Sequence, residues 1–141
     1  MAANTASSPP VGEIAGLRGV RECLQWFTRE KKWINEMHLQ LCRVPAPTFL
    51  EQERAEWMRA QFRALGCETT IDRAGNLIAT LRPYVEGPFV ALTAHLDTVL
   101  APRNKDEIVV EPDGRLRGPG VADNGAGLAA LLAIVRALKS C

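Results

Sequence analysis

The sequence predicts an α/β fold in which a mixed sheet is flanked by helices, and three observations support that class. Two segments, residues 13–43 and 48–65, repeat apolar side chains at helical spacing. Residues 89–94 form an apolar run with Thr93 as its one polar residue, which is typical of a strand buried on both faces. Residues 125–139 are so rich in alanine and leucine that the predicted helix has almost no polar face and needs a sheet to cover it.

The N-terminal region divides into a tail and a helix. Residues 1–12 are rich in alanine, serine and proline and are expected to form a disordered tail, so the predicted domain comprises residues 13–141. From Glu13 onwards, apolar side chains recur every three or four residues, which predicts one amphipathic helix. That helix should end near Arg43, because two prolines follow it closely.

A second helix is predicted to start at a capping box formed by Thr48 and Glu51. In such a box, the threonine hydroxyl accepts a hydrogen bond from the backbone of the glutamate, and the glutamate side chain reaches back. Gly66 supplies the left-handed residue at which many helices stop.

Two hairpins are predicted, one on each side of the buried strand. Residues 68–72 and 76–81 flank a three-residue turn, a length that suits an antiparallel pair. Residues 108–110 and 115–117 flank a Pro-Asp-Gly turn signal.

Composition and charge restrict the function. Hydrophobic residues make up 47% of the 141 residues and charged residues 23%, which is the balance of a globular domain. A formal net charge of +1 gives no electrostatic reason to expect a nucleic-acid partner. The N-terminus lacks the features of a secretory signal, and no run approaches the roughly 18 apolar residues of a membrane span, so a cytoplasmic protein without membrane contact is expected.

The four cysteines form no Cys-x-x-Cys pair and are expected to be reduced thiols.

One histidine and two carboxylates are predicted to gather where the buried strand ends and the last helix begins. His95 and Asp97 follow the apolar run directly, and Asp123 lies in a glycine-rich segment just before the helix. Neutral imidazole and carboxylate are common ligands of zinc. The sequence therefore predicts a metal site at this junction.

Two motifs stand in order, about 25 residues apart: His95-Leu96-Asp97-Thr98-Val99 and Gly120-Val121-Ala122-Asp123-Asn124-Gly125-Ala126-Gly127. Together they resemble the first two signatures of the di-zinc exopeptidase family that includes aminoacylase, carboxypeptidase G and the bacterial tripeptidases. The resemblance extends over roughly residues 34–138, because the Pro-Ala-Pro-Thr entry to the second helix and a Gly-Asn-Leu turn also look like that family. It implies a zinc metallopeptidase, a hydrolase that cleaves peptide or N-acyl amide bonds with a zinc-activated water.

The resemblance implies a role for each of three side chains. His95 would ligate one zinc ion, and Asp123 would bridge that ion to a second one. Asp97 would be a catalytic-site residue outside the ligand set, since it would accept the other ring N–H of His95 and fix its tautomer. Donor atoms that share one zinc ion would lie about 3–4 Å apart, and the peptide bond between Asp123 and Asn124 would be cis. Zinc is the implied cofactor, with two ions in the complete site and cobalt as an alternative.

The family's second half has no counterpart in this sequence. A complete site needs a glutamate general base and further ligands, yet no histidine follows His95 and no glutamate follows Glu111. The other histidine, His38, lies on the buried stripe of the first predicted helix and is assigned a packing role. We therefore expect an incomplete catalytic domain, an inactive fragment whose remaining ligands and dimerisation domain lie beyond Cys141. The complete protein would be a homodimer that acts on a peptide or an N-acyl amino acid.

Two other interpretations remain open. Gly125, Gly127 and Ala130 match Gly-x-Gly-x-x-Ala at the start of a helix, which indicates dinucleotide binding when a buried strand directly precedes it. The second interpretation is a non-catalytic remnant of the fold, in which the histidine and the two carboxylates persist without catalysing a reaction.

Overall fold

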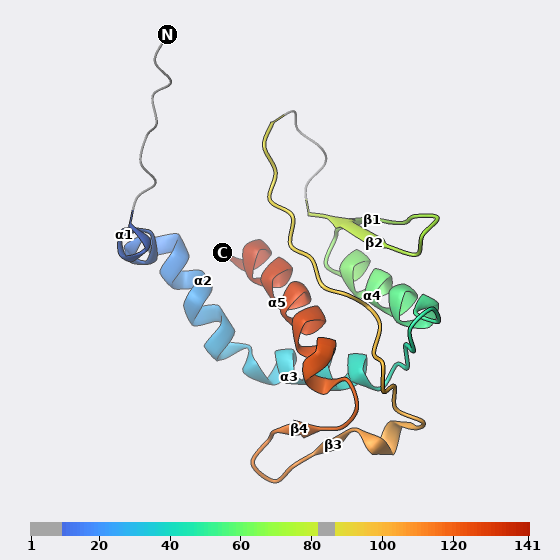
Figure 1. Cartoon of the computed structure of the whole chain (residues 1–141). Coiled ribbons are helices and arrows are strands. Elements are labelled where there is room, and N and C mark those ends of the chain that lie inside the picture. The colour runs from blue at the N-terminus through green and yellow to red at the C-terminus, as the bar shows by residue number, and fades with distance from the viewer. Residues whose placement is uncertain (1–9, 82–86) are drawn as a thin grey trace.

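The computed structural model describes residues 10–81 and 87–141. It combines helices with short antiparallel strands (Figure 1), which confirms the predicted α/β class. The elements in chain order are α1 (Val11–Gly16), α2 (Arg18–Arg29), α3 (Lys31–Cys42), α4 (Gln52–Ala64), β1 (Glu68–Ile71), β2 (Leu77–Thr80), the short helix η1 (Lys105–Glu107), β3 (Val109–Val110), β4 (Leu116–Arg117), a distorted helical turn η2 (Val121–Ala126) and α5 (Gly127–Ser140). Of the predicted tail, residues 1–9 lie outside the described residues.

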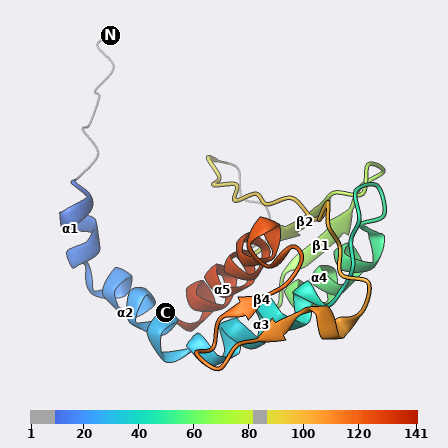
Figure 2. The same cartoon turned by 60° about the horizontal axis from the view of Figure 1, so that its bottom comes forward.

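The prediction of a single helix over residues 13–43 is wrong, because three helices, α1, α2 and α3, occupy this part of the chain. α1 and α2 are separated at Leu17, whose ψ of 138° is extended, and α2 and α3 at Glu30, whose ψ of 13° leaves the helical range. The bend at Glu30 lets α2 and α3 both pack on α5, with the rings of Trp26 and Trp33 6.3 Å apart. Figure 2 shows α1 lying away from α3, α4 and α5. The apolar spacing continues across both breaks and so could not reveal them.

Helix α4 begins without the predicted capping box. Its N-cap residue is Glu51, with no side-chain cap hydrogen bond, and the Thr48 hydroxyl donates to Asp97 instead. The Glu51 carboxylate accepts a hydrogen bond from the backbone N–H of Phe49 at 2.7 Å, inside the turn before the helix. The Thr48 side chain therefore bonds to Asp97, which is distant in sequence, and not to the backbone of Glu51 as predicted. The helix stops where predicted, before Gly66, whose φ of 76° is left-handed.

Both predicted hairpins are present. β1 pairs antiparallel with β2, with Glu68 opposite Thr80. The Asp72 carboxylate closes the turn between them by accepting two backbone N–H groups at 2.9 Å. β3 pairs antiparallel with β4, with Val109 opposite Arg117. Local turn chemistry was thus sufficient to predict both pairs.

Residues 89–94, predicted as a buried strand, form no ladder within the described residues. The segment runs between α5 and α4 in Figure 1, and its side chains Phe89 and Val90 are 83% and 88% exposed. Both ladders in the described part of the chain are antiparallel, so the predicted mixed sheet is not formed there. An apolar strand is buried on both faces only when flanking strands and covering helices are in place. The β1–β2 hairpin does not pair with this segment and therefore does not bury it.

Helix α5 lies in the core, as its composition predicted, but it packs mainly on helices and not on the predicted sheet. Leu132 packs in one cluster with Leu41 of α3 and Met58 of α4. Another side of α5 packs against Trp26 of α2. Contrary to the expectation that no run approaches a membrane span, Val121–Ser140 is apolar enough to cross a membrane by length and composition alone, with a mean hydropathy of 1.5. Because α2 and α3 of the same chain pack against α5, we interpret it as the core helix of the domain.

Candidate metal centre

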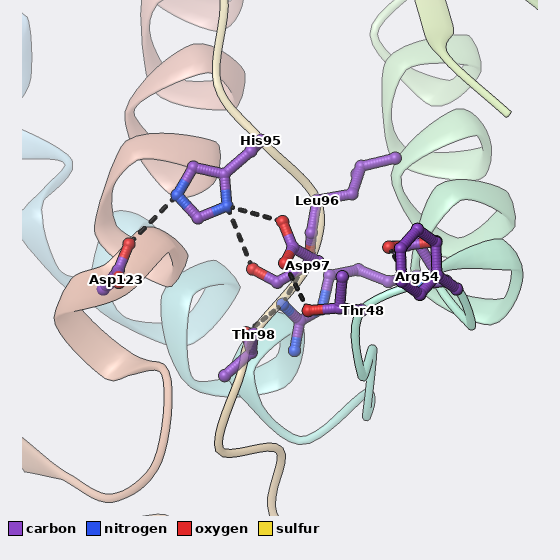
Figure 3. Close-up of polar contacts among 9 residues, drawn as sticks. Thr48, Arg54, His95, Leu96, Asp97, Thr98 and Asp123 are labelled. Atoms are coloured by element: carbon purple, nitrogen blue, oxygen red, sulfur yellow. Dashed lines mark hydrogen bonds and ion pairs between the residues drawn. The ribbon is translucent and has the colours of Figure 1, made fainter. Parts of the chain in front are cut away.

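The histidine and the aspartate of the His-x-Asp motif face each other. Nδ1 of His95 lies 3.0 Å from Oδ1 of Asp97 and 3.0 Å from the main-chain oxygen of the same residue (Figure 3). A proton on Nδ1 is donated to these oxygens, which orients the imidazole ring and directs Nε2 away from Asp97. The contact that the sequence predicted between the two side chains is therefore present.

Asp123 reaches the same imidazole from the turn ahead of α5. Gly120 precedes that turn with a φ of 70°, a left-handed conformation that favours glycine. Asp123 itself leaves the helical path, with φ −115° and ψ 95°, and its peptide bond to Asn124 is cis, as predicted. Nε2 of His95 lies 3.0 Å from Oδ1 of Asp123. The two side chains converge, at the short end of the separation predicted for donors that share one zinc ion.

His95 is shared between two carboxylates, and this arrangement governs its proton. Both ring nitrogens can donate to these oxygens only when the imidazole is protonated. Burial lowers the pKa of His95, but the hydrogen bonds to Asp97 and Asp123 outweigh burial and raise the pKa above its ordinary value. The side chains of His95 and Asp123 are 50% and 85% exposed, so solvent reaches the proton between them.

Thr48 completes the hydrogen bonding of Asp97. Its hydroxyl donates to Oδ2 of Asp97 at 2.7 Å, so one carboxylate oxygen serves Thr48 and the other serves His95. The hydrogen bond from Thr48 is the main reason that the pKa of Asp97 lies below its usual value. Sequence analysis missed this role because Thr48 also fits a capping box. The Pro-Ala-Pro-Thr segment, which is part of the family resemblance, was the one sequence feature that could have indicated a role for Thr48 at the site.

Arg54 of α4 is a second residue that the sequence analysis did not single out. It is 1% exposed, and its Nη1 donates to the Leu96 carbonyl and to the Thr98 hydroxyl, directly beneath the His-x-Asp motif. The sequence did offer one indication that Arg54 is buried. It stands four residues before Met58, a predicted core residue, and this spacing places both side chains on the same face of a helix.

The donor chemistry fits zinc, but the described residues supply two converging donors. An imidazole whose second nitrogen is held by a carboxylate, with a further carboxylate beside it, matches the ligand types that zinc takes in proteins. Across residues 10–81 and 87–141, no group of three or more His, Cys, Asp or Glu side chains could hold a metal ion. Zinc takes about three or four protein ligands. His95 and Asp123 by themselves therefore supply fewer donors than one zinc ion takes.

The glycines of the Gly-x-Gly-x-x-Ala motif serve close packing. A Cβ atom on Gly125 would lie 2.5 Å from Sγ of Cys42, and one on Gly127 would lie 2.1 Å from Oδ1 of Asn124. Gly125 itself lies in the distorted turn η2, and the residues before it belong to that turn, where a dinucleotide-binding motif requires a strand. The structure therefore gives the dinucleotide interpretation no support. His38 fixes the same turn by donating from Nε2 to a main-chain oxygen at 2.8 Å, in line with its assigned packing role.

Comparison with known proteins points to hydrolases. Residues 76–141, which contain both motifs, match the model of Peptidase family M28. The chain is 33% identical over 125 residues to the uncharacterized protein YqjE of Bacillus subtilis, an alignment that covers 80% of this chain and 33% of the relative. It is 30% identical over 115 residues to the cytosol non-specific dipeptidase of Escherichia coli, covering 71% of this chain and 24% of the relative.

A third relative comes from Pyrococcus abyssi and is named as a LysW-lysine and LysW-ornithine hydrolase. It is 33% identical over 94 residues, which cover 66% of this chain and 26% of the relative. The chain thus spans between about a quarter and a third of the length of these relatives. The family model and two of these relatives are a peptidase or a hydrolase by name, which confirms the resemblance that the two motifs indicated.

Proposed function

We propose that this chain carries part of the active site of a zinc-dependent exopeptidase or a related amidohydrolase, the kind of enzyme indicated by its relatives and by the match at residues 76–141. One observation carries the proposal: Asp97 and Asp123 hold the two ring nitrogens of His95, each at 3.0 Å. His95 and Asp123 are exposed and Asp97 is partly exposed, and such solvent-accessible ion pairs contribute little to stability. Stability alone therefore gives a weak reason for placing an imidazole between two carboxylates.

In this proposal His95 and Asp123 are metal ligands, and Asp97 orients His95. Asp97 retains a proton on Nδ1, so that the lone pair of Nε2 is directed towards Asp123. When the Nε2 proton leaves, the nitrogen lone pair and the carboxylate oxygen both face the position that the proton occupied. By the family resemblance, Asp123 would also serve a second zinc ion. Bound zinc would polarise the carbonyl of the substrate as a Lewis acid and favour deprotonation of water.

The substrate, the compartment and the assembly belong to the same proposal. The dipeptidase among the relatives supports a peptide or an N-acyl amino acid as substrate, since both present an amide bond. The relatives are longer than this chain, and a glutamate general base and further ligands would come from protein outside the described residues. We propose a cytoplasmic homodimer for the complete protein, without nucleic-acid or membrane partners.

Zinc binding by the 141-residue chain tests the proposal. Affinity would be measured by competition with a chromophoric chelator in a Cys141→Ser background, because Cys141 is an exposed thiol and thiolates also bind zinc. His95→Ala and Asp123→Asn should each weaken binding at least about 10-fold. Asp113→Asn, which alters an exposed carboxylate in the β3–β4 turn, should leave the affinity unchanged. Equal binding by the parent chain and by His95→Ala would contradict the proposal.

A further inference from the structure

Arg54 is the largest of the fully buried side chains, and it is charged. Its hydrogen bonds all go to neutral oxygens: Nε and Nη2 donate to the Val44 carbonyl at 3.0 and 2.7 Å, and Nη1 donates to the Leu96 carbonyl at 2.8 Å and to the Thr98 hydroxyl at 2.7 Å. None of the ion pairs in the described part of the chain includes Arg54. The charge of Asp97 favours the ionised guanidinium without pairing with it, and burying a cation that is not directly paired is unfavourable. Core packing alone therefore does not explain an arginine here.

The acceptors of the guanidinium tie the turn before α4 to the His-x-Asp motif. Leu96 stands between His95 and Asp97, so the bond to its carbonyl fixes the main chain that carries both side chains. The backbone N–H of Thr98 also donates to the carbonyl of Ala46 at 2.8 Å. The motif and the turn are thus held together at several points.

Thr98 extends this contact to the segment that carries Asp123. A Cβ atom on Gly120 would lie 2.4 Å from Cγ2 and 2.7 Å from Oγ1 of Thr98. The buried Thr98 side chain therefore packs directly on the α-carbon of Gly120, close to Asp123 in sequence. Through Thr98, Arg54 is linked to both segments whose side chains meet at the candidate metal centre (Figure 3).

We propose that Arg54 is a positioning residue of the candidate metal centre. Through the Leu96 carbonyl and the Thr98 hydroxyl, it holds the segments of the two proposed ligands in their converging arrangement. This inference rests on the proposed function, because the ligands matter only if the centre binds a metal. A guanidinium suits the role, since its donors are fixed in a planar fork and it stays ionised when buried. A lysine has a single nitrogen and cannot bond all three oxygens in the same geometry.

Two substitutions test the proposal in the 141-residue chain with the Cys141→Ser background. Arg54→Met keeps much of the side-chain volume and removes every donor, and it should weaken zinc binding about 10-fold. Thr98→Val keeps the shape and removes the hydroxyl, and it should weaken binding roughly threefold, since the bond to Leu96 survives. Phe62→Ala is the control: it removes a core contact of α4 two turns further along, so it should lower Tm but change zinc affinity less than about twofold.

A second measurement does not depend on zinc. In NMR spectra of the metal-free chain, slow exchange of the Nδ1 proton of His95 reports its hydrogen bond to Asp97. We expect that slow exchange in the parent chain and in Phe62→Ala, and its loss in Arg54→Met. If Arg54→Met and Thr98→Val alter neither zinc affinity nor this proton more than Phe62→Ala does, the positioning role is overturned and Arg54 is a core anchor. Absence of zinc binding in the parent chain would instead contradict the proposed function, and the Nδ1 proton would still decide whether Arg54 positions His95.

Discussion

At the scale of single residues, the proton on His95 decides when a metal can bind. Nε2 faces Asp123 across 3.0 Å, so a protonated imidazole places a proton in that contact. Because the pKa of His95 is raised, this proton is retained to a higher pH than on a free imidazole. A metal ion competes with the proton for the same nitrogen lone pair. Zinc affinity should therefore increase with pH until the pH exceeds the pKa of His95.

We predict that the pKa of His95, measured by NMR titration of the metal-free chain, lies above the ordinary value of about 6.5. Burial lowers this pKa, and the hydrogen bonds to Asp97 and Asp123 raise it, so Asp97→Asn and Asp123→Asn should each lower it. A raised pKa means that the folded state binds the proton more tightly. Its contribution to stability is therefore fully present below about pH 6.5 and is lost as the pH rises through the raised pKa. An unchanged pKa in both variants would contradict the geometry.

Three site residues could be predicted from motifs along the chain, whereas two others, Thr48 and Arg54, could not, because their roles depend on partners distant in sequence. His95, Asp97 and Asp123 stand out because their residue types and spacing form motifs that can be read along the chain. Thr48 was assigned to a capping box because the sequence does not show that Asp97 competes for its hydroxyl from 49 residues away. Arg54 is explained only by acceptors on two loops, which the fold brings together.

At the scale of elements, the turn before α5 depends on a glycine that has no room for a side chain. A Cβ atom on Gly125 would lie 2.5 Å from Sγ of Cys42 and 2.8 Å from the carbonyl oxygen of Gly120. We predict that Gly125→Ala lowers the free energy of unfolding by about 1–3 kcal/mol, because a core sulfur and a main-chain oxygen must both shift. Urea denaturation measures this quantity.

Gly19→Ala is the matched control for that prediction. Gly19 lies in α2 with nothing within 4 Å of the added Cβ, so alanine should leave the stability unchanged or raise it by up to about 1 kcal/mol. Equal effects of the two substitutions would show that the turn can relax around a side chain.

The elements that could be predicted from sequence are those whose causes are local. The two hairpins follow from turn residues such as Asp72, which closes its own turn. The bend at Glu30 follows instead from the packing of α2 and α3 on α5, which periodicity along one helix does not record. Residues 89–94 were predicted as a strand from their own composition, whereas a strand also requires a partner.

At the scale of the whole molecule, the apolar segment at residues 89–94 is a surface that favours association. Phe89, Val90 and Leu92 are 83%, 88% and 55% exposed, and the segment has no ladder partner in the described part of the chain. Exposed apolar segments with free backbone donors and acceptors promote pairing between chains. We predict concentration-dependent association in sedimentation experiments and its reduction by Val90→Lys, with Leu138→Lys on α5, another exposed apolar position, as the comparison. A sharp cooperative unfolding transition of a strictly monomeric chain would contradict this account.

Catalysis requires more groups than the described residues bring to His95. No glutamate follows Glu111 to act as general base, and two metal ligands are fewer than zinc takes. Loss of a general acid–base group alone costs about 100- to 10,000-fold in rate. We therefore predict that the 141-residue chain, supplied with zinc or cobalt, shows no measurable hydrolysis of peptides or N-acyl amino acids. Turnover that is present in this chain and abolished by His95→Ala would contradict that expectation.

The most direct test of the central claim, that His95 and Asp123 bind zinc, is X-ray absorption at the zinc edge on the chain loaded with one equivalent of metal. The geometry predicts nitrogen and oxygen neighbours at about 2.0–2.2 Å. Scattering from one imidazole ring should be present in the parent chain and absent from His95→Ala. Sulfur neighbours at about 2.3 Å, or an identical spectrum for the parent chain and His95→Ala, would contradict the claim.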